Sequence, residues 1–522
     1  MSVQRTRATV AVTTAVTALI VVLTFALFST TAWSSDSTTP SGSASSAATA
    51  PDSTAGLAAM PQMQAASESK IKNVVFILAD DLDWAAFEQV PRLKALESAG
   101  MTFRNFVVTD SLCCPSRSSI LRSQYVHNHL VVSNRDASGG GWQTFYVRGE
   151  ENDCLATWLH DAGVQTAFFG KYLNEFGKGK TGPTWVPPGW DRWFVPVTDG
   201  AMYRGYNYTI DSNGTLVKYG DKPKDFLPDV LIEKSTQFIE NTTEPFYVQI
   251  NPTTPHAPFP VAKRHAKADK GAHLPQTASF NAVGLNEAPW RASLPKLSPK
   301  RLKKMEKDWR QRVRSAESIA DAYDAVRASL QRSGKLDSTL IVVGSDNGFH
   351  AANRRLPEGK RTPYAEDTVV PYVFIGPDVP AAKAVNDLTS TIDLGPTFSA
   401  LLGGNTPTWT DGRSLVPFLA DASVDTWRTG ILTESLSAPE PGDPDFDALK
   451  PPRFESLRTQ RWVYVEYADG SKELFDRAAD PVEMNNVIDT TDPTTVAALA
   501  RQLRAFENCA GDTCRIADAL PN

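Results

Sequence analysis

The chain has 522 residues, of which 41% are hydrophobic and 21% are charged. This length and composition fit a globular protein with one large α/β domain and a smaller one, and they exclude a single small domain. The formal net charge of −6 gives no indication of a nucleic-acid partner. Any anion-binding site must therefore be locally basic against an acidic background.

The N-terminal segment has the pattern of an export signal. Arg5 and Arg7 precede a long uncharged run that ends in small residues. We expect residues 1–33 to be a secretory signal peptide or an uncleaved N-terminal anchor, since the run is just long enough to span a bilayer. Residues 34–68 are rich in Ser, Thr, Ala, Pro and Gly and predict a disordered linker. The protein is expected to be secreted or extracytoplasmic, and to meet a membrane only through this segment.

The first apolar run of strand length, residues 73–78, predicts a buried parallel strand. It ends in Asp80 and Asp81, with Asp83 close behind. Carboxylates at the end of a buried strand lie where open α/β sheets bind ligands, and two adjacent oxygen ligands favour Ca²⁺ or Mg²⁺. A helix N-cap would explain one aspartate but not an adjacent pair.

A helix over residues 90–100 and a strand over residues 101–108 are predicted next, followed by the run LCCPSRSSIL. Pro115 suits the first turn of a helix, which would place Cys113 at the helix N-terminus, where an anion is favoured. Arg117 adds a planar donor fork for a sulfate or phosphate. The alternative is a buried, inert cysteine pair.

The middle of the chain contains two more candidate site residues. A helix over residues 154–162 and a strand over residues 165–169 precede Lys171, which taken alone would be read as a solvated lysine. Residues 180–225 predict long loops rich in Gly, Pro, Trp and Tyr, which would either wall a substrate site or pack as ordinary loops. The apolar run 246–250 predicts a second buried strand, and His256 follows it between two prolines, a position that suits a rigid site loop.

Beyond this histidine, residues 262–300 predict a surface excursion and residues 302–332 a long helix. We interpret the many basic residues of the helix as a solvated face. Residues 338–344 predict a third buried strand, which ends near Asp346 and Asn347. Together with the earlier aspartate pair, these two residues complete an oxygen-ligand set for one hard cation.

The C-terminal part predicts a strand over residues 369–376, a small domain from Trp427 onward, a strand over residues 461–467 and a helix over residues 494–506.

The five cysteines suit an exported protein. Cys509 and Cys514 close a short loop and predict a disulfide, and Cys114 with Cys154 is a candidate for a second one. Cys113 would be left unpaired. None of the spacings predicts a zinc site.

Several motifs together resemble those of the sulfatase family. CCPSRSSIL matches the family pattern C-x-P-S-R-x-x-x-L-T-G, with Arg122-Ser123 in place of Thr-Gly, and GKYLN, PHAP and SDNGFH follow in family order. Leu173 stands where many sulfatases carry histidine, a departure shared with the N-acetylglucosamine-6-sulfatase-like branch, which the chain most resembles. The resemblance covers roughly residues 70–490.

The resemblance implies an α/β fold, the alkaline-phosphatase-like sandwich, with a mixed central sheet flanked by helices over residues 69–425. A smaller C-terminal α/β subdomain would occupy residues 426–522. It also implies hydrolysis of sulfate esters, with sulfated sugars or aryl sulfates as the expected class of substrate, whether a small molecule or a glycan. Cys113 would be converted to formylglycine by a formylglycine-generating or equivalent maturation enzyme, and the aldehyde hydrate would attack sulfur.

The family motifs assign roles to individual positions. The implied cofactor is Ca²⁺, with Mg²⁺ as the alternative, and His256 or Lys360 would protonate the leaving alcohol. The implied catalytic residues are Cys113, Arg117, Lys171, His256 and Lys360; the metal ligands are Asp80, Asp81, Asp346 and Asn347; and the substrate-binding residues are Asn174 and His350. The resemblance leaves Asp83 as a surface or capping residue.

Two other functions stay open at this stage. A phosphomonoester or phosphonate hydrolase would use the same fold and nucleophile. A non-catalytic, exported glycan-binding protein would keep Cys113 unmodified.

Overall fold

The computed structural model describes residues 69–179, 181–197, 200–424, 427–439 and 451–522. The expected export signal and linker, residues 1–68, lie outside the described residues. Among the helices of the described part, none is both long enough and apolar enough to cross a membrane.

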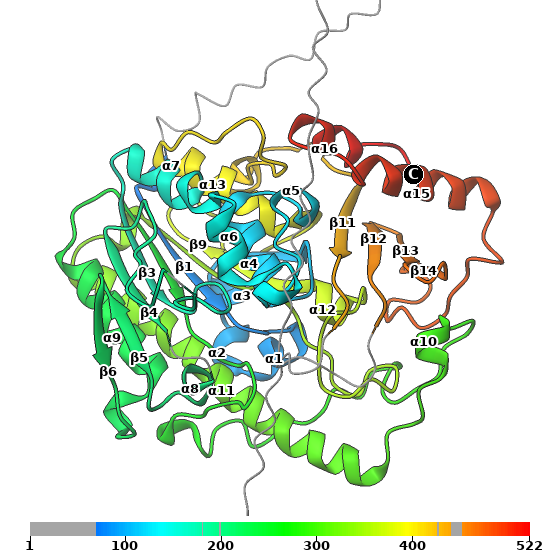
Figure 1. Cartoon of the computed structure of the whole chain (residues 1–522), viewed down its shortest axis with the longest axis horizontal. Helices are drawn as coiled ribbons and strands as arrows, with labels where there is room; N and C mark the ends of the chain where they lie inside the picture. The colour runs from blue at the N-terminus through cyan, green and yellow to red at the C-terminus, as the bar shows by residue number, and fades with distance from the viewer. Residues whose placement is uncertain (1–68, 180, 198–199, 425–426, 440–450) are drawn as a thin grey trace, which may run out of the picture. The chain divides into compact units, whose positions relative to one another are not determined.

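A ten-stranded sheet organises the large domain (Figure 1). Its strands follow the order β10-β2-β9-β8-β1-β7-β3-β4-β5-β6. Their bounds are β1 (Asn73–Ala79), β2 (Met101–Val107), β3 (Gln165–Gly170), β4 (Arg192–Pro196), β5 (Thr209–Ser212), β6 (Thr215–Lys218), β7 (Phe246–Asn251), β8 (Thr339–Ser345), β9 (Val369–Ile375) and β10 (Lys383–Ser390).

The centre of the sheet consists of the parallel neighbours β8, β1, β7 and β3. These strands include all three that the sequence predicted from continuous apolar runs, as expected for strands buried on both faces. β9 pairs antiparallel with both β8 and β2, so the sheet is mixed. The carboxyl ends of the central strands meet at one edge, where open α/β sheets bind ligands.

Alternate residues of β1 face two different cores. Val75 and Ile77 belong to one buried cluster, and Val74 and Phe76 belong to the other. This alternation follows from the two-residue period of a strand. The first core is covered by α1 (Trp84–Gln89), α2 (Pro91–Lys94), α3 (Leu96–Ala99), α9 (Leu227–Asn241) and α11 (Pro299–Arg332); the second by α4 (Cys113–Arg122), α6 (Gly141–Val147), α7 (Leu155–Asp161), α13 (Leu394–Leu402) and α14 (Val416–Leu419).

A second, four-stranded antiparallel sheet forms the C-terminal region, drawn in orange in Figure 1. On α15 (Pro493–Phe506), Leu499 and Leu503 pack against Leu457 and Tyr464 of this sheet. The result is the small α/β unit that the sequence predicts. The other elements of this unit are β11 (Gly430–Ser435), β12 (Phe454–Thr459), β13 (Trp462–Tyr467), β14 (Lys472–Asp476) and α16 (Asp512–Ala517).

The structure corrects two elements predicted from the sequence. Residues 90–100 form two short helices rather than one, because the chain turns at Ala95 between α2 and α3. Residues 180–225 are not only loops, since they contain β4, β5, β6 and the short helix α8 (Ala201–Arg204). These strands have four or five residues each and lie at the edge of the sheet, so their apolar pattern is too short to stand out among the turn residues.

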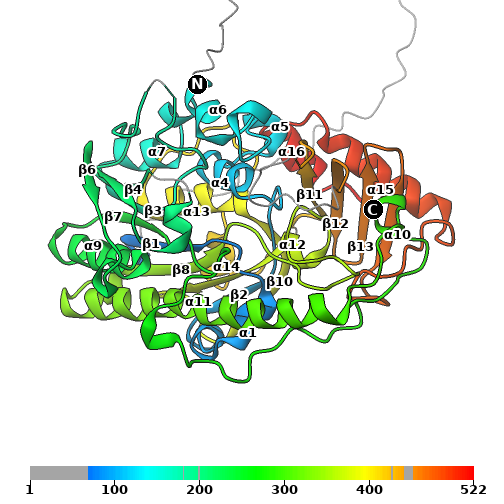
Figure 2. The same ribbon diagram turned by 60° about the horizontal axis from the view of Figure 1, so that its bottom comes forward.

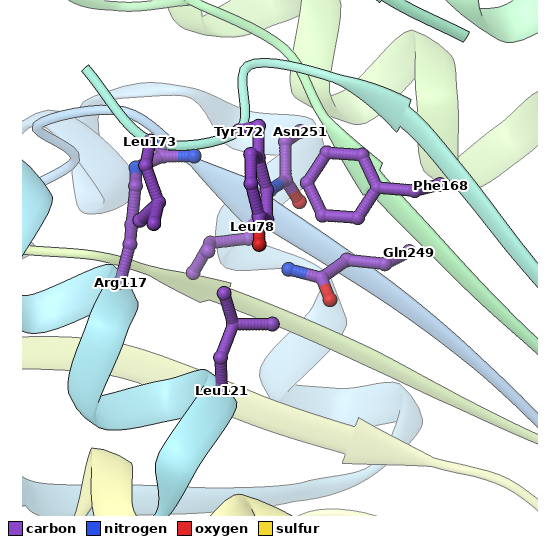
Figure 3. A pocket seen from close by; sticks show the side chains of 8 residues that line it. All are labelled: Leu78, Arg117, Leu121, Phe168, Tyr172, Leu173, Gln249 and Asn251. Atoms are coloured by element: carbon purple, nitrogen blue, oxygen red, sulfur yellow. The ribbon is translucent and has the colours of Figure 1, made fainter. Parts of the chain in front are cut away.

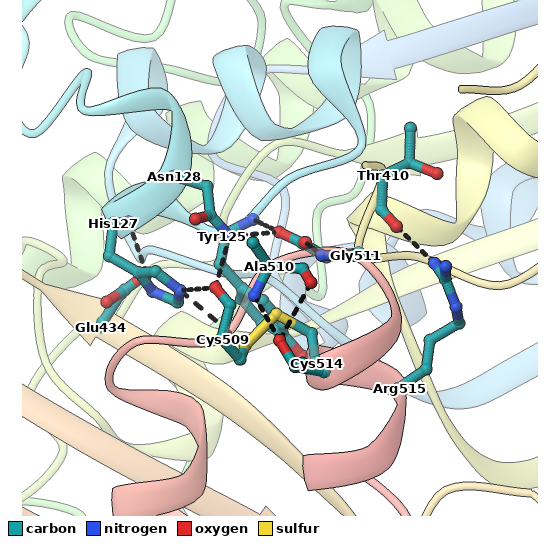
Figure 4. The surroundings of a disulfide bond; sticks show 12 residues. Tyr125, His127, Asn128, Thr410, Glu434, Cys509, Ala510, Gly511, Cys514 and Arg515 are labelled. Atoms are coloured by element: carbon teal, nitrogen blue, oxygen red, sulfur yellow. Dashed lines mark hydrogen bonds and ion pairs between the residues drawn. A yellow bond between two sulfur atoms is a disulfide. The ribbon is translucent and has the colours of Figure 1, made fainter. Parts of the chain in front are cut away.

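The cysteine pairing also differs from the prediction. Cys509 and Cys514 form a disulfide (Figure 4). The predicted bond between Cys114 and Cys154 is wrong, because both are free thiols buried in the same apolar cluster. The Cys154 thiol lies 3.6 Å from the backbone oxygen of Glu151 and makes its hydrogen bond there.

Candidate active site

Three strands of the central sheet, β1, β8 and β3, deliver charged side chains to one edge of the sheet. Ala79 of β1 is level with Ser345 of β8, so Asp80 and Asp346, the next residue on each strand, emerge side by side. Gly170 of β3 has a φ of +110°, and a Cβ at this position would lie 2.1 Å from the Asn251 carbonyl oxygen of β7. Only glycine therefore allows β3 to pass so close to β7 and present Lys171.

Cys113 is the first residue of α4, with Leu112 as its extended N-cap, as the Pro115 position predicts. Its Sγ lies 2.8 Å from Lys360 Nζ and 3.5 Å from Asp80 Oδ1. Burial raises the pKa of the Cys113 thiol well above its usual range, although Lys171 and Lys360 act in the opposite direction. A thiol held in its protonated form is a poor nucleophile, so the unmodified cysteine is not suited to attack an ester.

Three carboxylates converge on this cysteine. Oxygen atoms of Asp80, Asp81 and Asp346 lie within 4.8 Å of one another, and all three residues are buried. Asp81 has a φ of +70°, and its backbone N–H donates to Asp346 Oδ1 at 3.1 Å. Asp83 caps α1 by accepting from the Ala86 N–H at 2.9 Å. It is a buried capping residue rather than a surface one.

Each carboxylate of the cluster is paired with a cation. Lys171 Nζ lies 2.8 Å from Asp80 Oδ2, Lys360 Nζ lies 2.6 Å from Asp81 Oδ1, and Arg117 Nε lies 2.7 Å from Asp346 Oδ2. Burial alone would raise the pKa of Asp80, but the cations around it, Lys171 foremost, lower it below its usual range. Burial also acts on Asp346 and raises its pKa despite Arg117.

Two buried polar atoms in this cluster lack hydrogen-bond partners among the described residues: Asn347 Oδ1 and Arg117 Nη2. The Asn347 amide nitrogen is engaged, since it donates to Asp81 Oδ1 at 2.7 Å. An unpartnered amide oxygen beside three carboxylates is a donor set that suits a hard divalent cation. An unpartnered guanidinium N–H suits an oxygen of an anion. The residues therefore fit both a metal ion and a sulfate.

His256 lies in the loop after β7 and faces the same cluster. Its Nε2 lies 3.8 Å from Asp81 Oδ2, and its Nδ1 lies 2.7 Å from the Ala257 carbonyl oxygen, which assigns the proton of the neutral ring to Nδ1. The ring packs against Tyr203 of α8 with centroids 4.4 Å apart. Sequence reasoning missed Tyr203, and its only signal is its place among the aromatic residues of 180–225.

A buried arginine holds the turn that contains Asp81 and Asp83. Arg312 of α11 donates to the Asp81 carbonyl oxygen and to the Asp83 carboxylate. The guanidinium also lies 4.1 Å from the ring of Phe349. No sequence pattern indicates this role, because Arg312 lies in a helix with many other basic residues.

The two residues predicted to bind substrate lie at different places. His350 Nδ1 donates a hydrogen bond to Asp367 Oδ2 at 2.9 Å, and the His350 backbone pairs with Gly359, next to Lys360. It thus holds the loop that carries this lysine. The Asn174 carbonyl oxygen accepts from the Trp142 N–H at 2.7 Å, and its buried side-chain oxygen has no hydrogen-bond partner among the described residues.

Leu173 lines a small internal cavity, too narrow to hold a water molecule, between α4 and the ends of β3 and β7. Figure 3 shows Arg117 and Leu121 rising from α4 toward Leu173 and Asn251. Leu173 is buried and belongs to the second apolar core. The side chain at this position packs in the core rather than supplying a polar group. The cavity is lined by Leu78, Arg117, Leu121, Phe168, Tyr172, Leu173, Gln249 and Asn251.

Comparison with known proteins identifies two matching family models. The model described as Sulfatase matches residues 72–404. The model described as N-sulphoglucosamine sulphohydrolase, C-terminal, matches residues 358–508. The two matches span the ten-stranded sheet and most of the C-terminal unit.

Two curated relatives are sulfatases. N-acetylglucosamine-6-sulfatase of Capra hircus is 33% identical over 487 residues, which cover 86% of this chain and 86% of the relative. A protein of Drosophila melanogaster named extracellular sulfatase SULF-1 homolog is 33% identical over 378 residues, which cover 70% of this chain but only 33% of the relative.

Solved structures share the fold. A protein solved in complex with its substrate D-glucosamine-2-N,6-O-disulfate has a TM-score of 0.70 and 18% identity, covering 86% of this chain and 99% of that one. A phosphonate monoester hydrolase of Silicibacter pomeroyi has a TM-score of 0.62 and 25% identity, covering 83% and 94%. Since the family model matches well over half of the chain and the goat enzyme aligns along most of it, the chain belongs to the sulfatase family and is a sulfuric ester hydrolase.

Proposed function

We propose that the protein removes the 6-O-sulfate of an N-acetylglucosamine unit in a sulfated sugar or glycan. The observation that carries the proposal is the alignment with N-acetylglucosamine-6-sulfatase along 86% of both chains. The cluster of paired lysines, arginine and carboxylates around Cys113 supports it, because an anionic ester needs cations at the reacting centre.

Formylglycine derived from Cys113 is the proposed nucleophile, and it supplies the hydroxyl of an aldehyde hydrate. The raised pKa of the buried thiol supports this assignment, since the unmodified side chain would stay protonated. Cys113 is fully buried, so a maturation enzyme must reach it before the domain folds.

The proposed metal ligands are Asp80, Asp81, Asp346 and Asn347, and the proposed ion is Ca²⁺. The clustered carboxylate oxygens and the unpartnered Asn347 Oδ1 support an all-oxygen site. Ca²⁺ accepts irregular sets of oxygen ligands more readily than Mg²⁺, which demands near-ideal octahedral geometry. When bound, the ion supplies Lewis-acid stabilisation of negative charge at the reacting oxygens.

The basic residues of the site have different proposed roles. Arg117, with its unpartnered Nη2, and Lys171 hold sulfate oxygens and balance the charge that develops on them. Lys360 stands beside the reacting side chain, 2.8 Å from Cys113 Sγ. His256 carries its second proton on Nε2, which faces the cluster, and donates it to the departing alcohol oxygen.

The two proposed substrate-binding residues differ in the support they have. The unpartnered side-chain oxygen of Asn174 is available to accept a hydrogen bond from a sugar hydroxyl. His350 supports the same pocket mainly by holding the Lys360 loop.

The remaining proposals concern domains and export. Residues 69–425 form the catalytic domain and residues 426–522 the C-terminal subdomain. The protein is exported by its N-terminal segment, which is either cleaved or kept as an anchor. The similarity to an extracellular sulfatase of Drosophila melanogaster supports export, and the Cys509–Cys514 disulfide suits an oxidising compartment.

One experiment tests the nucleophile and the reaction together. Mass analysis of the peptide spanning Cys113 to Arg117 should show formylglycine, and the same preparation should hydrolyse N-acetylglucosamine 6-sulfate and a chromogenic aryl sulfate. Cys113→Ala should abolish both activities, while the matched control Cys114→Ala, which removes the neighbouring thiol from the apolar cluster, should keep them. An unmodified Cys113 in an inactive protein would instead favour a non-catalytic glycan-binding protein.

A second candidate function is phosphonate or phosphate monoester hydrolysis. The structural similarity to the phosphonate monoester hydrolase of Silicibacter pomeroyi, at 25% identity, is the observation that favours it. Sulfate, phosphate and phosphonate esters of one alcohol should be compared at equal concentration. A large preference for the phosphate or phosphonate ester would refute the proposed sulfated-sugar specificity.

A further inference from the structure

One segment of the chain departs strongly from its acidic background. Residues 263–310 contain twelve Lys and Arg but only four Asp and Glu, a net charge of +8. The remaining residues therefore carry −14, since the whole chain has −6. A basic segment of this size in an acidic protein creates a local positive potential that attracts anions.

The two ends of this segment pack together on one side of the large domain. Arg310 Nε of α11 donates to the Ala272 carbonyl oxygen at 3.0 Å, and Arg314 Nε donates to the Ala268 carbonyl oxygen at 3.0 Å. The Leu274 N–H donates to Glu306 at 2.9 Å. The loop after His256 and the first half of α11 thus form one continuous surface; Figure 2 shows α11 running along the front of the large domain.

The arginines of this surface are mostly neutralised. Arg264 pairs with Asp229 and Asp321, and Arg310 pairs with Glu306 at 2.8 Å. Seven exposed lysines, in contrast, form no ion pair and no side-chain hydrogen bond with the residues that the structure describes. We call these residues the lysine strip: Lys263, Lys267, Lys270, Lys296, Lys300, Lys303 and Lys307.

Three members of the lysine strip lie on one face of α11. Lys300, Lys303 and Lys307 have the i, i+3, i+7 spacing that aligns side chains along a helix. With a rise of about 1.5 Å per residue, they extend over about 10 Å. Their charges stand in a row and are free of the carboxylates that neutralise Arg310 and Lys304.

The lysine strip is connected to two loops that carry proposed active-site residues. The loop that carries His256 runs directly into Lys263. At the other end of the strip, Arg301 of α11 pairs with Glu358, two residues before Lys360, at 3.2 Å. The strip therefore begins at one catalytic loop and ends beside another.

We propose that the lysine strip binds the polyanionic chain of a sulfated polysaccharide while one of its sulfate groups occupies the active site. This inference rests on the proposed function and adds where the rest of the substrate lies. Unpaired lysines on flexible stems suit sulfates at variable positions, whereas the buried Arg117 fork suits a single fixed one. Binding through many exposed charges must weaken with salt, because such contacts are screened.

Two triple variants test the proposal. Lys300→Gln/Lys303→Gln/Lys307→Gln removes three charges from the strip. The matched control Lys218→Gln/Lys222→Gln/Lys224→Gln removes three exposed charges near β6, at the far edge of the sheet. Each protein is applied to immobilised heparin, a sulfated polysaccharide, and eluted with salt. Heparin binding needs no matured Cys113, so it is read independently of activity.

The strip variant should elute at clearly lower salt than both the wild type and the control. Its KM for a sulfated oligosaccharide should rise about 3- to 10-fold at low ionic strength, whereas kcat/KM for N-acetylglucosamine 6-sulfate should not change. A second variant in the loop, Lys263→Gln/Lys267→Gln/Lys270→Gln, should have the same effect and covers the case in which the helix variant folds poorly.

Other outcomes overturn the proposal. Elution of both strip variants together with the wild type would show that the strip does not bind the polysaccharide. Retention on vesicles of anionic lipid without retention on heparin would assign the strip to a membrane surface instead. A wild type that binds heparin but hydrolyses no sulfated sugar would refute the proposed function while leaving the binding result intact.

Discussion

Two of the buried clusters of ionised groups in the described residues differ in whether their polar atoms are all paired. The active-site cluster holds Asp80, Lys171 and Arg117. The second cluster lies between α13 and the C-terminal residues, where Arg428 makes two hydrogen bonds to Asp393, at 2.7 and 2.8 Å, and a third to Asp518 at 3.2 Å. Both clusters are almost completely excluded from solvent.

The second cluster is complete. Among the described residues, no buried side-chain nitrogen or oxygen of Arg428, Asp393 or Asp518 lacks a hydrogen-bond partner. In the active-site cluster, Asn347 Oδ1 and Arg117 Nη2 do lack one. Leaving a buried polar atom unpaired costs free energy, and a bound metal ion or sulfate would offset that cost in the active-site cluster. Pairing thus distinguishes the Arg428 cluster, which is complete, from the active-site cluster, which is open to a ligand.

The largest effect, a loss of stability, is expected from removing the cation of the fully paired Arg428 cluster. Arg428→Met leaves the Asp393 and Asp518 carboxylates buried without a cation and should lower the free energy of unfolding by about 3–5 kcal/mol. Urea denaturation measures this loss in the free energy of unfolding. The matched control is Arg461→Met, which breaks an exposed, solvent-screened pair with Asp476 and should leave the free energy of unfolding almost unchanged. Equal losses in the two variants would contradict the structural role of the buried cluster.

Lys171→Met tests the active-site cluster in the same way. Removing one cation from the reacting centre should lower kcat/KM for N-acetylglucosamine 6-sulfate by about 10²- to 10³-fold. The loss should appear in activity while the circular dichroism spectrum stays that of the wild type. A variant that keeps more than a tenth of the activity would show that Lys171 does not contact the sulfate.

The sequence correctly predicted where the residues at strand ends lie, and the reason is physical. Asp80, Lys171 and Asp346 each follow a buried strand, and parallel strands bring such positions to one edge of the sheet. Side chains that reach the site from other elements have no such signal. Arg312 and Tyr203 act through tertiary contacts made by α11 and α8, which no local pattern in either helix records.

The family resemblance supplied what strand patterns could not. It singled out Cys113, Lys360 and His350, which lie in loops or at a helix start rather than after a predicted strand. It did not prevent the error over Cys114 and Cys154. Two cysteines in an exported chain satisfy the counting argument for a disulfide, but the packing of α4 and α7 in one apolar cluster keeps them as separate thiols.

Removal of the divalent ion should have an intermediate effect. A ligand present at about 100 times its Kd stabilises a protein by about 2.7 kcal/mol. Treatment with a chelator should therefore lower the Tm, and Ca²⁺ should restore it. Asn347→Leu, which deletes the unpartnered amide oxygen, should make the Tm much less sensitive to the chelator. A wild-type Tm that changes with neither the chelator nor Ca²⁺ would refute the proposed metal site.

The smallest effect concerns a contact between the large domain and the C-terminal unit. His127 Nδ1 lies 2.9 Å from Glu434 Oε1, and its Nε2 lies 3.0 Å from the Cys509 carbonyl oxygen (Figure 4). Burial alone would lower the pKa of His127, but Glu434 and this carbonyl raise it to about 9. The protonated ring should stabilise the fold by about 1.5 kcal/mol.

The sign of this effect fixes its pH dependence. Because the folded-state pKa lies above the ordinary value for histidine, the contribution is fully present below about pH 6.5 and is lost as the pH rises through about 9. Urea denaturation of the wild type and His127→Gln should therefore differ most at pH 6 and least near pH 10. A stability difference that does not change with pH would mean that the ring contributes through packing and neutral hydrogen bonds, and not through its charge.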